Sequence, residues 1–383
     1  MQHSVALLVG RERSFPDALI EEVTRRDEGV IACYAELEAT RMDRPPPYDV
    51  LVDRISHEVT CYQPVLKLCA LYGARVINDP FWRIADDKFF NAALATRLGV
   101  AVPRTVVLPS KSYTDDVSTE TLRNLRYVDW DTLGSELGYP MYLKPHWGGG
   151  WRDVHRVTSK DELLAAYDKS GRTTMIAQQG IEWTQYVRCL VIGREQVLPA
   201  LWDPRLSHFD RYVRAPESMP PLSEELTHRI IADSRTLCRA LGYDMNTVEF
   251  AVHDGIPYAI DFMNSAPDFD VSSLGETYFR WVVERMADLV IDAARRPRPE
   301  EGEVSRPVLD AYRASRPDTD VSGDGLLDDF DDGAPEAPGS GASGEAWPNA
   351  RRTLQVSERE TGANPDASPT SRPNVHRDVW RRG

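Results

Sequence analysis

The sequence predicts an α/β fold followed by a long C-terminal segment that has no core of its own. Strand-like and helix-like segments alternate over residues 1–85, which is typical of a parallel sheet. Of the 383 residues, 42% are apolar, which is enough for a sizeable core. From residue 298 onwards Pro, Gly, Ser, Asp and Arg dominate, so we expect disorder there. The length allows two or three domains at roughly 150 residues each.

The N-terminal elements follow from short apolar runs and capping signals. The strands expected in this region are Ser4–Val9, Asp49–Arg54 and Arg75–Asn78. Ser14 and Asp17 predict a capping box for the first helix, with Pro16 in its first turn. A second helix is expected near Cys61–Tyr72.

The remaining elements are placed by the same signals. The strands expected here are Thr105–Leu108, Met141–Lys144, Thr174–Gln178, Gln185–Ile192, Asn246–Val252 and Pro257–Met263. The helices expected are Asp86–Leu98, a segment from Ser159 to about Ser170, Glu224–Leu241 and Glu276–Ala294. Ser159 and Glu162 form a second capping box, and His253-Asp254-Gly255 predicts a hairpin turn.

Charge and cysteine content exclude several classes of protein. The chain carries 45 basic and 60 acidic residues, a formal net charge of -15, which argues against nucleic-acid binding and against docking on anionic lipid. The five cysteines contain no C-x-x-C pair, so a zinc site or a disulfide framework is not expected, and a reducing cytoplasm is the default. No signal peptide and no 18-residue apolar span is recognised, so we expect neither secretion by that route nor a membrane span.

Two lysines and a glycine run have the chemistry of a polyphosphate site. Lys88 opens a predicted helix, and Lys144 ends a predicted strand just before Gly148, Gly149 and Gly150. The backbone N–H groups of such a loop can approach an anion closely, and fixed lysines hold phosphates. The alternative is a flexible turn with a nearby surface lysine.

A second group of residues has the chemistry of a metal site. Glu249 and Asp261 lie on the two strands of the predicted hairpin, and Asn264 follows. Two carboxylates and an amide suit Mg²⁺ held between protein and phosphates. Arg188, on a predicted strand near the polar segment QGIEWT, is a candidate to hold a phosphoryl group during its transfer. The alternatives are a solvated acidic face and an ion-paired surface arginine.

The order of these motifs resembles the ATP-grasp superfamily, above all the branch of ribosomal-protein glutamate ligases, glutathione synthetases and D-alanine–D-alanine ligases. The resemblance covers residues 48–292 and rests on the motifs DK…GVAVP, YLKP, QQGI, YVRCLVIG and the closing Asp/Asn strand pair. It implies an ATP-grasp fold in four parts. These are a Rossmann-like pre-ATP-grasp domain (1–85), a lid subdomain with the glycine-rich loop (86–185), a C-terminal subdomain with the metal site (186–297) and the disordered tail (298–383).

The resemblance also implies roles for individual residues. Lys88 and Lys144 would hold the α- and β-phosphates of ATP, and Gly148–Gly150 would close over them. Arg188 would face the phosphoryl transfer. The adenine joint would consist of Gln178, Gln179, Gly180 and Ile181, with Glu182 on the ribose. The ligands of Mg²⁺, with Mn²⁺ as an alternative, would be Glu249, Asp261 and Asn264.

The sequence departs from the family pattern at three places. The family usually ends in Glu-x-Asn, whereas Asp261-Phe-Met-Asn264 is one residue longer, so a β-bulge is needed to return Asn264 to the metal. If the strand runs straight, Asp268 becomes the candidate third ligand. The joint carries Gln179 where Glu is common, and Trp147 and Trp151 flank the glycine loop.

Substrate residues are less sharply indicated. Arg54 occupies the place where related ligases present an arginine to the second substrate, and the alternative is an ion pair with a nearby acid. The stretch DPRLSHFDRYVR brings Arg205, His208, Arg211 and Arg214 together, which suits a carboxylate substrate; the alternative is a charged surface loop. In the tail, the acidic residues of 318–329 partly match a calcium loop, but acidic disorder is the preferred interpretation.

The sequence therefore predicts an ATP-dependent ligase that joins a carboxylate to an amine, or to a thiol, through an acylphosphate with release of ADP and phosphate. Its partners would be small-molecule substrates or a peptide or protein terminus, with a homodimer as one option. The alternatives are a nucleotide-binding regulatory or scaffold protein without turnover, and a phosphotransferase on the same fold.

Overall fold

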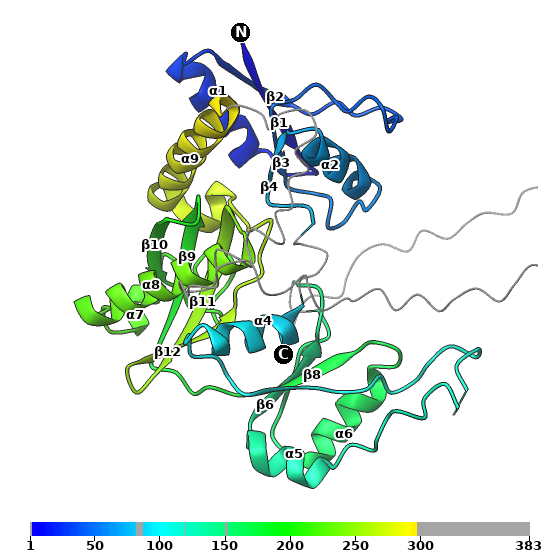
Figure 1. Ribbon diagram of the computed structural model, residues 1–383. Coiled ribbons are helices and arrows are strands. Elements are labelled where there is room, and N and C mark those ends of the chain that lie inside the picture. The colour runs from blue at the N-terminus through cyan, green and yellow to red at the C-terminus, as the bar shows by residue number, and fades with distance from the viewer. Residues whose placement is uncertain (1, 82–86, 119, 150–151, 297–383) are drawn as a thin grey trace, which may run out of the picture. The chain divides into compact units, whose positions relative to one another are not determined.

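The computed structural model describes residues 2–81, 87–118, 120–149 and 152–296. Within these residues the chain forms three four-stranded sheets with helices packed on them (Figure 1). The predicted tail, including residues 318–329, lies outside the described residues, as do Asp86, Gly150 and Trp151. No helix in the described ranges is long and apolar enough to cross a membrane.

The first sheet is parallel, as the alternation of strands and helices predicts. Its strand order is β2-β1-β3-β4, with β1 at His3–Leu8, β2 at Val30–Tyr34, β3 at Val50–Asp53 and β4 at Arg75–Ile77. Helix α1 (Ser14–Arg26) connects β1 to β2, and helix α2 (Tyr62–Leu71) connects β3 to β4. Strand β2 is an addition to the sequence prediction.

The capping box predicted at Ser14 is wrong. Helix α1 begins at Ser14 itself, and no side chain caps its N-terminus. The Ser14 hydroxyl donates instead to Asp270 Oδ2 at 2.8 Å and accepts from the backbone N–H of Val271 at 3.2 Å. A residue that looks like a local cap is therefore used to join α1 to a segment 256 residues away.

The second sheet is antiparallel and has its own core. Its strands are β5 (Thr105–Val107), β8 (Met175–Gln179), β6 (Met141–Pro145) and β7 (His155–Val157), in that order. Its helices are α5 (Trp130–Leu137) and α6 (Lys160–Lys169). The predicted cap at Ser159 is confirmed, because its hydroxyl accepts from the N–H of Glu162 at 3.2 Å. Leu143, Leu163 and Met175 are fully buried in this core.

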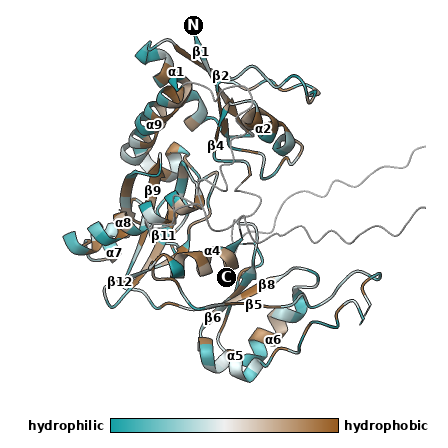
Figure 2. Cartoon of the chain, in the orientation of Figure 1, coloured by the Kyte–Doolittle hydropathy of each residue, from teal (hydrophilic) through white to brown (hydrophobic). Residues whose placement is uncertain are grey.

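The third sheet is also antiparallel, in the order β10-β9-β11-β12. Its strands are β9 (Gln185–Ile192), β10 (Gln196–Leu201), β11 (Met245–His253) and β12 (Ile256–Asp261). The short helix α7 (Ala215–Ser218) and helix α8 (Glu224–Leu241) follow β10, and helix α9 (Val271–Arg295) follows β12. In Figure 2 the cartoon colours of strands such as β9 and β11 are mostly hydrophobic, whereas hydrophobic and hydrophilic residues alternate along α9.

The two faces of the third sheet belong to different cores. Residues such as Val187 and Phe250 pack with α8, whereas Tyr186 and Ala251, on the other face, pack with α9 and the first sheet. Helix α4 (Lys88–Arg97) contributes Ala95 to the α8 side. The start of the range predicted for the lid subdomain therefore packs with the third sheet, because its apolar face is buried there.

Two polar side chains tie the first sheet to the third. Asn78, after β4, donates to Met245 O at 2.7 Å and to Ser265 O at 3.0 Å, and its Oδ1 accepts from Met245 N. Arg54, after β3, donates to Pro267 O at 2.6 Å. The first sheet thus holds both the start of β11 and the segment that leaves β12.

Candidate functional site

A small cleft lies where the second and third sheets meet helix α4. Lys88 and Asn91 line it from α4, Lys144 from β6 and Gln178 from β8. The remaining wall is the end of β12 and the residues that follow, Ala259–Met263, including Asp261. Residues separated by up to 175 positions in the sequence therefore share one small space, as the resemblance predicts for the phosphate site.

The two predicted lysines lie in this cleft beside the glycine loop. Lys144 is 8% exposed, and burial lowers the pKa of its ammonium to about 8 in spite of the opposing charges of Asp261 and Glu249. Lys88 lowers the pKa of Lys144 further because the two positive charges repel. Lys88 Nζ donates to the carbonyl of Gly148, and its backbone N–H donates to His146 O at 2.8 Å. A bound polyanion would offset both the desolvation of the Lys144 ammonium and its repulsion by Lys88.

The described part of the glycine loop is open. Gly148 has a φ of +94°, which favours glycine. A Cβ at Gly149 would meet no heavy atom within 4 Å. Together these two residues leave room for a ligand to approach the backbone.

The predicted adenine joint begins inside the cleft. Gln178 is 6% exposed and donates to Thr105 Oγ1 at 2.9 Å, which links β8 to β5. Gln179 is held by Arg104, whose side chain donates to Gln179 Oε1 at 3.3 Å. Ile181 is half-buried, while Glu182 is exposed. The joint therefore leaves the second sheet at the edge of the cleft, and its role toward a nucleotide stays a prediction.

Gly180 is the one joint residue that its surroundings require to be glycine. Its N–H donates to Pro140 O at 3.0 Å, and a Cβ here would lie 2.4 Å from that carbonyl oxygen. Because both groups are backbone, Gly180→Ala is expected to lower the free energy of unfolding by about 1–3 kcal/mol. Urea unfolding measures this loss, with Gly149→Ala, where space is open, as the matched control. Equal stability of the two variants would contradict the prediction.

Three of the predicted residues form a row across the third sheet. In the strand registers Arg188 of β9 lies opposite Glu249 of β11, and Glu249 lies opposite Asp261 of β12. Residues directly opposite each other on antiparallel strands point to the same face. The row therefore places one guanidinium and two carboxylates side by side on the face away from α8.

A β-bulge puts Asp261 into this row. Phe250 pairs with Ala259 and Glu249 pairs with Asp261, so Ile260 is an extra residue on β12. In a regular ladder without the bulge, Glu249 would pair with Ile260. Asp261 would then share a face with Ala259 and point toward α8, because side chains alternate along a strand. The sequence analysis left open a bulge or a straight strand after Asp261; the structure has a bulge one residue before Asp261.

Glu249 contacts two residues of β9. Its Oε2 accepts from the hydroxyl of Tyr186 at 2.9 Å, and its Oε1 lies 3.5 Å from Arg188 Nε. Burial raises the pKa of the Glu249 carboxyl, Asp261 adds to that effect, and Arg188 opposes it. Tyr186 is fully buried, and desolvation raises the pKa of its hydroxyl well above the usual value. The site thus concentrates negative charge that a cation would stabilise.

Asn264 reaches the same face by a different route. Its Nδ2 donates at 2.9 Å to Thr247 Oγ1, and Thr247 lies two residues before Glu249 on β11, so the two share a face. Asp268, the alternative third ligand, contacts His208 at 3.1 Å and accepts from Asp270 N at 3.0 Å. The placement of Asn264 therefore favours Asn264 over Asp268 as the third metal ligand.

The donor set fits a hard divalent cation. No group of three or more His, Cys, Asp or Glu side chains that could bind a metal occurs in the described residues. Glu249 and Asp261 instead supply two carboxylates and Asn264 an amide, which suits Mg²⁺ when phosphate oxygens complete its shell.

Arg54 is placed in an ion pair. Its Nε and one terminal nitrogen donate to the carboxylate of Glu12 at 2.9 and 2.6 Å, and its guanidinium carbon lies 5.1 Å from the ring centres of Phe15 and Phe269. Its side chain is 4% exposed. Together with its bond to Pro267, this arrangement favours the ion-pair alternative over contact with a substrate.

In the basic stretch after β10, some arginines form ion pairs with acidic residues of the described chain and one does not. Arg205 forms a bidentate pair with Asp203, and Arg214 lies 3.3 Å from Glu217. Arg211 has no acidic partner among the described residues; it stacks at 5.2 Å on the ring of Trp202, which Arg188 also contacts at 5.1 Å. Of the predicted substrate arginines, Arg211 is therefore best placed to accept an anion near the row.

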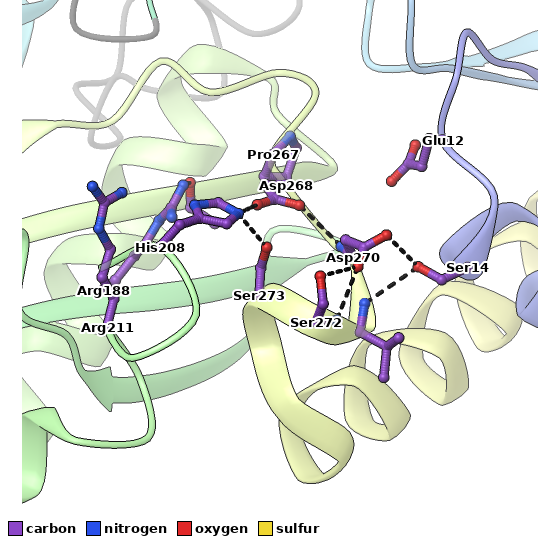
Figure 3. A network of polar contacts seen from close by, with 12 residues as sticks. Glu12, Ser14, Arg188, His208, Arg211, Pro267, Asp268, Asp270, Ser272 and Ser273 are labelled. Carbon is purple, nitrogen blue, oxygen red and sulfur yellow. Dashed lines mark hydrogen bonds and ion pairs between the residues drawn. The ribbon is translucent and has the colours of Figure 1, made fainter. Parts of the chain in front are cut away.

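His208 connects this stretch to the start of α9 through two polar contacts. Its Nε2 lies 2.6 Å from Ser273 Oγ and 3.1 Å from Asp268 Oδ2 (Figure 3). The same figure shows Asp270 bonded to Ser14 and Ser272, so the segment between β12 and α9 is held from several sides.

The sequence analysis missed three buried polar residues next to the row. Tyr186 lies two residues before Arg188 and so shares its face, a period-two signal that could have identified it. Thr247 precedes Glu249 by the same spacing. Tyr212 is buried beside Arg188, and burial raises the pKa of its hydroxyl to about 12. Tyr212 belongs to the basic stretch, where only the charged residues had been considered.

Comparison with known proteins identifies relatives of this arrangement. No protein-family model matches the chain. A D-alanine–D-alanine ligase of Ralstonia nicotianae is 25% identical over 259 residues, which are 61% of this chain and 77% of that ligase.

Two solved structures share the fold. The Bacillus anthracis D-alanine–D-alanine ligase complexed with ATP superimposes with a TM-score of 0.53 at 17% identity, over 79% of this chain and all of that one. The ATP-grasp ligase PsnB, complexed with a minimal precursor, Mg and ADP, gives 0.52 at 14% identity, over 76% of this chain and 98% of PsnB. With the three sheets and the cleft described above, these similarities show that the chain has the fold of ATP-grasp ligases.

Proposed function

We propose that the protein is an ATP-dependent ligase that joins a carboxylate to an amine, or to a thiol, through an acylphosphate. The observation that carries the proposal is the convergence of two lysines and Asp261 on one cleft, with Glu249 directly opposite Asp261 on the neighbouring strand. The relatives support the class of reaction, since they include ligases for D-alanine and a ligase that acts on a peptide precursor.

Each part of the site has a role in this reaction. Lys88 and Lys144 bind phosphate oxygens of ATP, and the glycine loop covers them. Glu249, Asp261 and Asn264 hold Mg²⁺, or Mn²⁺, which when bound neutralises charge on the phosphates. Arg188 then faces the phosphoryl group as it moves to the substrate carboxylate. Catalysis is almost entirely positioning and charge neutralisation.

The substrates are a small carboxylate and an amine, or the terminus of a peptide. Arg211 is the residue we assign to a substrate carboxylate, because its guanidinium has no acidic partner among the described residues and contacts the ring of Trp202, as Arg188 also does. The paired arginines Arg54 and Arg205 are weaker candidates for the same role.

Arg188→Ala is expected to lower turnover more than ATP affinity. The charge that Arg188 contacts develops during phosphoryl transfer, so its loss affects the transition state rather than the bound nucleotide. We expect a fall in kcat of about 10²–10³-fold with KM for ATP changed less than about threefold. Steady-state kinetics of ADP release separates the two parameters; a large rise in KM at constant kcat would instead make Arg188 a ground-state binding residue.

A screen of ADP release tests the proposed function. Amino acids and small peptides are supplied in all pairwise combinations with Mg²⁺-ATP, and release that needs both a carboxylate and an amine supports ligation. Release with a carboxylate alone and a stable phosphorylated product would identify a phosphotransferase. Nucleotide binding without release across the screen would favour the scaffold alternative.

A further inference from the structure

Asn264 lies beyond the end of the β11–β12 ladder and is held there by its own set of contacts. The last paired residue of β12 is Asp261, opposite Glu249, so the backbone that follows needs other hydrogen-bond partners. Asn246 supplies them: its Nδ2 donates to Phe262 O at 2.9 Å, and its Oδ1 accepts from Asn264 N at 2.9 Å. Asn246 is fully buried on the α8 face of β11.

The next residue of β11 holds the side chain of Asn264 from the other face. Thr247 is 1% exposed, and its Oγ1 accepts from Asn264 Nδ2 at 2.9 Å. The same oxygen accepts from a terminal nitrogen of Arg188 at 3.2 Å. A hydroxyl oxygen has two acceptor positions, so these two donors fill both.

This contact determines which end of the Asn264 amide is available to a cation. An amide offers one carbonyl oxygen and one NH₂ group, and only the oxygen can bind a metal ion. Because the NH₂ group donates to the buried hydroxyl of Thr247, the Oδ1 atom is the end left for a ligand. The extra residue between Asp261 and Asn264 therefore need not cost the chain its amide ligand.

We propose that Thr247 is a positioning residue that orients the Asn264 amide toward the metal and ties it to Arg188. The proposal rests on the proposed function for the presence of a divalent cation, and it does not depend on which substrates are joined.

The test measures Mn²⁺ affinity directly, by electron paramagnetic resonance, in the presence of a non-hydrolysable ATP analogue. Thr247→Val keeps the shape and removes the acceptor, and we expect about tenfold weaker Mn²⁺ binding, as is typical when a partner of a metal ligand is lost. Thr247→Ser keeps the hydroxyl and is expected to bind Mn²⁺ within about twofold of wild type. Thr247→Ala replaces Thr247→Val if the valine variant does not fold, with the same expectation.

A double-mutant cycle with Asn264→Ala identifies the residue through which Thr247 acts. If Thr247 acts by orienting Asn264, Thr247→Val adds no further loss in the Asn264→Ala background. A full additional loss there, or wild-type Mn²⁺ affinity in Thr247→Val, overturns the proposal. Because binding is measured without turnover, failure of the ligase assay together with the expected Mn²⁺ shifts would reject the proposed function and keep the role of Thr247.

Discussion

Asp261→Asn is expected to abolish ADP release while the chain remains folded. The bulge at Ile260 places the Asp261 carboxylate beside Glu249 and in the same cleft as Lys144. An amide of the same shape cannot replace the negative charge that holds a divalent cation between phosphates, and the loss of several kcal/mol of charge stabilisation corresponds to about 10³-fold or more in rate. The coupled assay for ADP, run with saturating Mg²⁺-ATP and the best substrate pair, measures the effect.

The matched control for this variant is Asp254→Asn. Asp254 lies in the β11–β12 turn, its side chain is 87% exposed, and its φ of +49° is one that asparagine accepts readily. The same chemical change on the same hairpin, away from the cleft, should leave ADP release within about twofold. Normal activity in Asp261→Asn would show that the metal binds elsewhere.

Lys144→Met is expected to weaken ATP binding by about 1.5–3 kcal/mol, which is roughly 10- to 100-fold in affinity. The lysine is buried and contributes a charge that phosphate oxygens would pair, whereas methionine fills the space without charge. Isothermal titration with the non-hydrolysable analogue gives the affinity. Lys160→Met, in which an exposed lysine paired with Asp131 is removed, is the control and should bind as wild type does.

The lowered pKa of Lys144 adds a dependence on pH. Since that pKa is about 8 in the nucleotide-free chain, the ammonium loses its proton as pH rises through 8, and wild-type ATP affinity should fall between pH 8 and 10. Lys144→Met should lack this fall. In the unfolded chain the pKa of a lysine is roughly 10.4, so the folded state binds this proton less tightly than the unfolded state does. The free energy of unfolding should therefore rise as pH increases from 8 toward that value. Identical pH profiles of ATP affinity for the two proteins would contradict the role of Lys144.

Much of the fold was accessible from the sequence because its strongest signals are local. Helix α8 matches its predicted range because a cap, an apolar face and a closing glycine agree. Strands β2 and β10 and the short helix α5 were not predicted, since segments of five to eight residues are too short to show a clear periodicity. Ser14 shows the limit of local reasoning: a serine with a capping signature is used for a contact with Asp270 that only the fold brings near.

In the candidate site, too, some residues could be identified from local sequence patterns, whereas others depend on contacts that only the fold creates. Lys88, Lys144, Glu249 and Asp261 could be selected from the sequence because their residue types and order match a known pattern. The position of the bulge could not be predicted from the sequence, because it depends on the pairing of β12 with β11. It also depends on Asn246, whose buried side chain forms hydrogen bonds with the backbone of Phe262 and Asn264. The partner of Arg54 was equally inaccessible, since Glu12 lies in another loop, 42 residues earlier.

Transfer of ¹⁸O from the substrate carboxylate to phosphate tests the central claim most directly. The carboxylate that gives ADP release in the screen, labelled with ¹⁸O in both oxygens, is incubated with its amine partner and Mg²⁺-ATP, and the released phosphate is analysed by mass spectrometry. Attack of the carboxylate on the γ-phosphorus followed by displacement by the amine leaves one ¹⁸O atom in each phosphate, and the proposed ligase chemistry predicts this result. Release of unlabelled phosphate in step with product would contradict it.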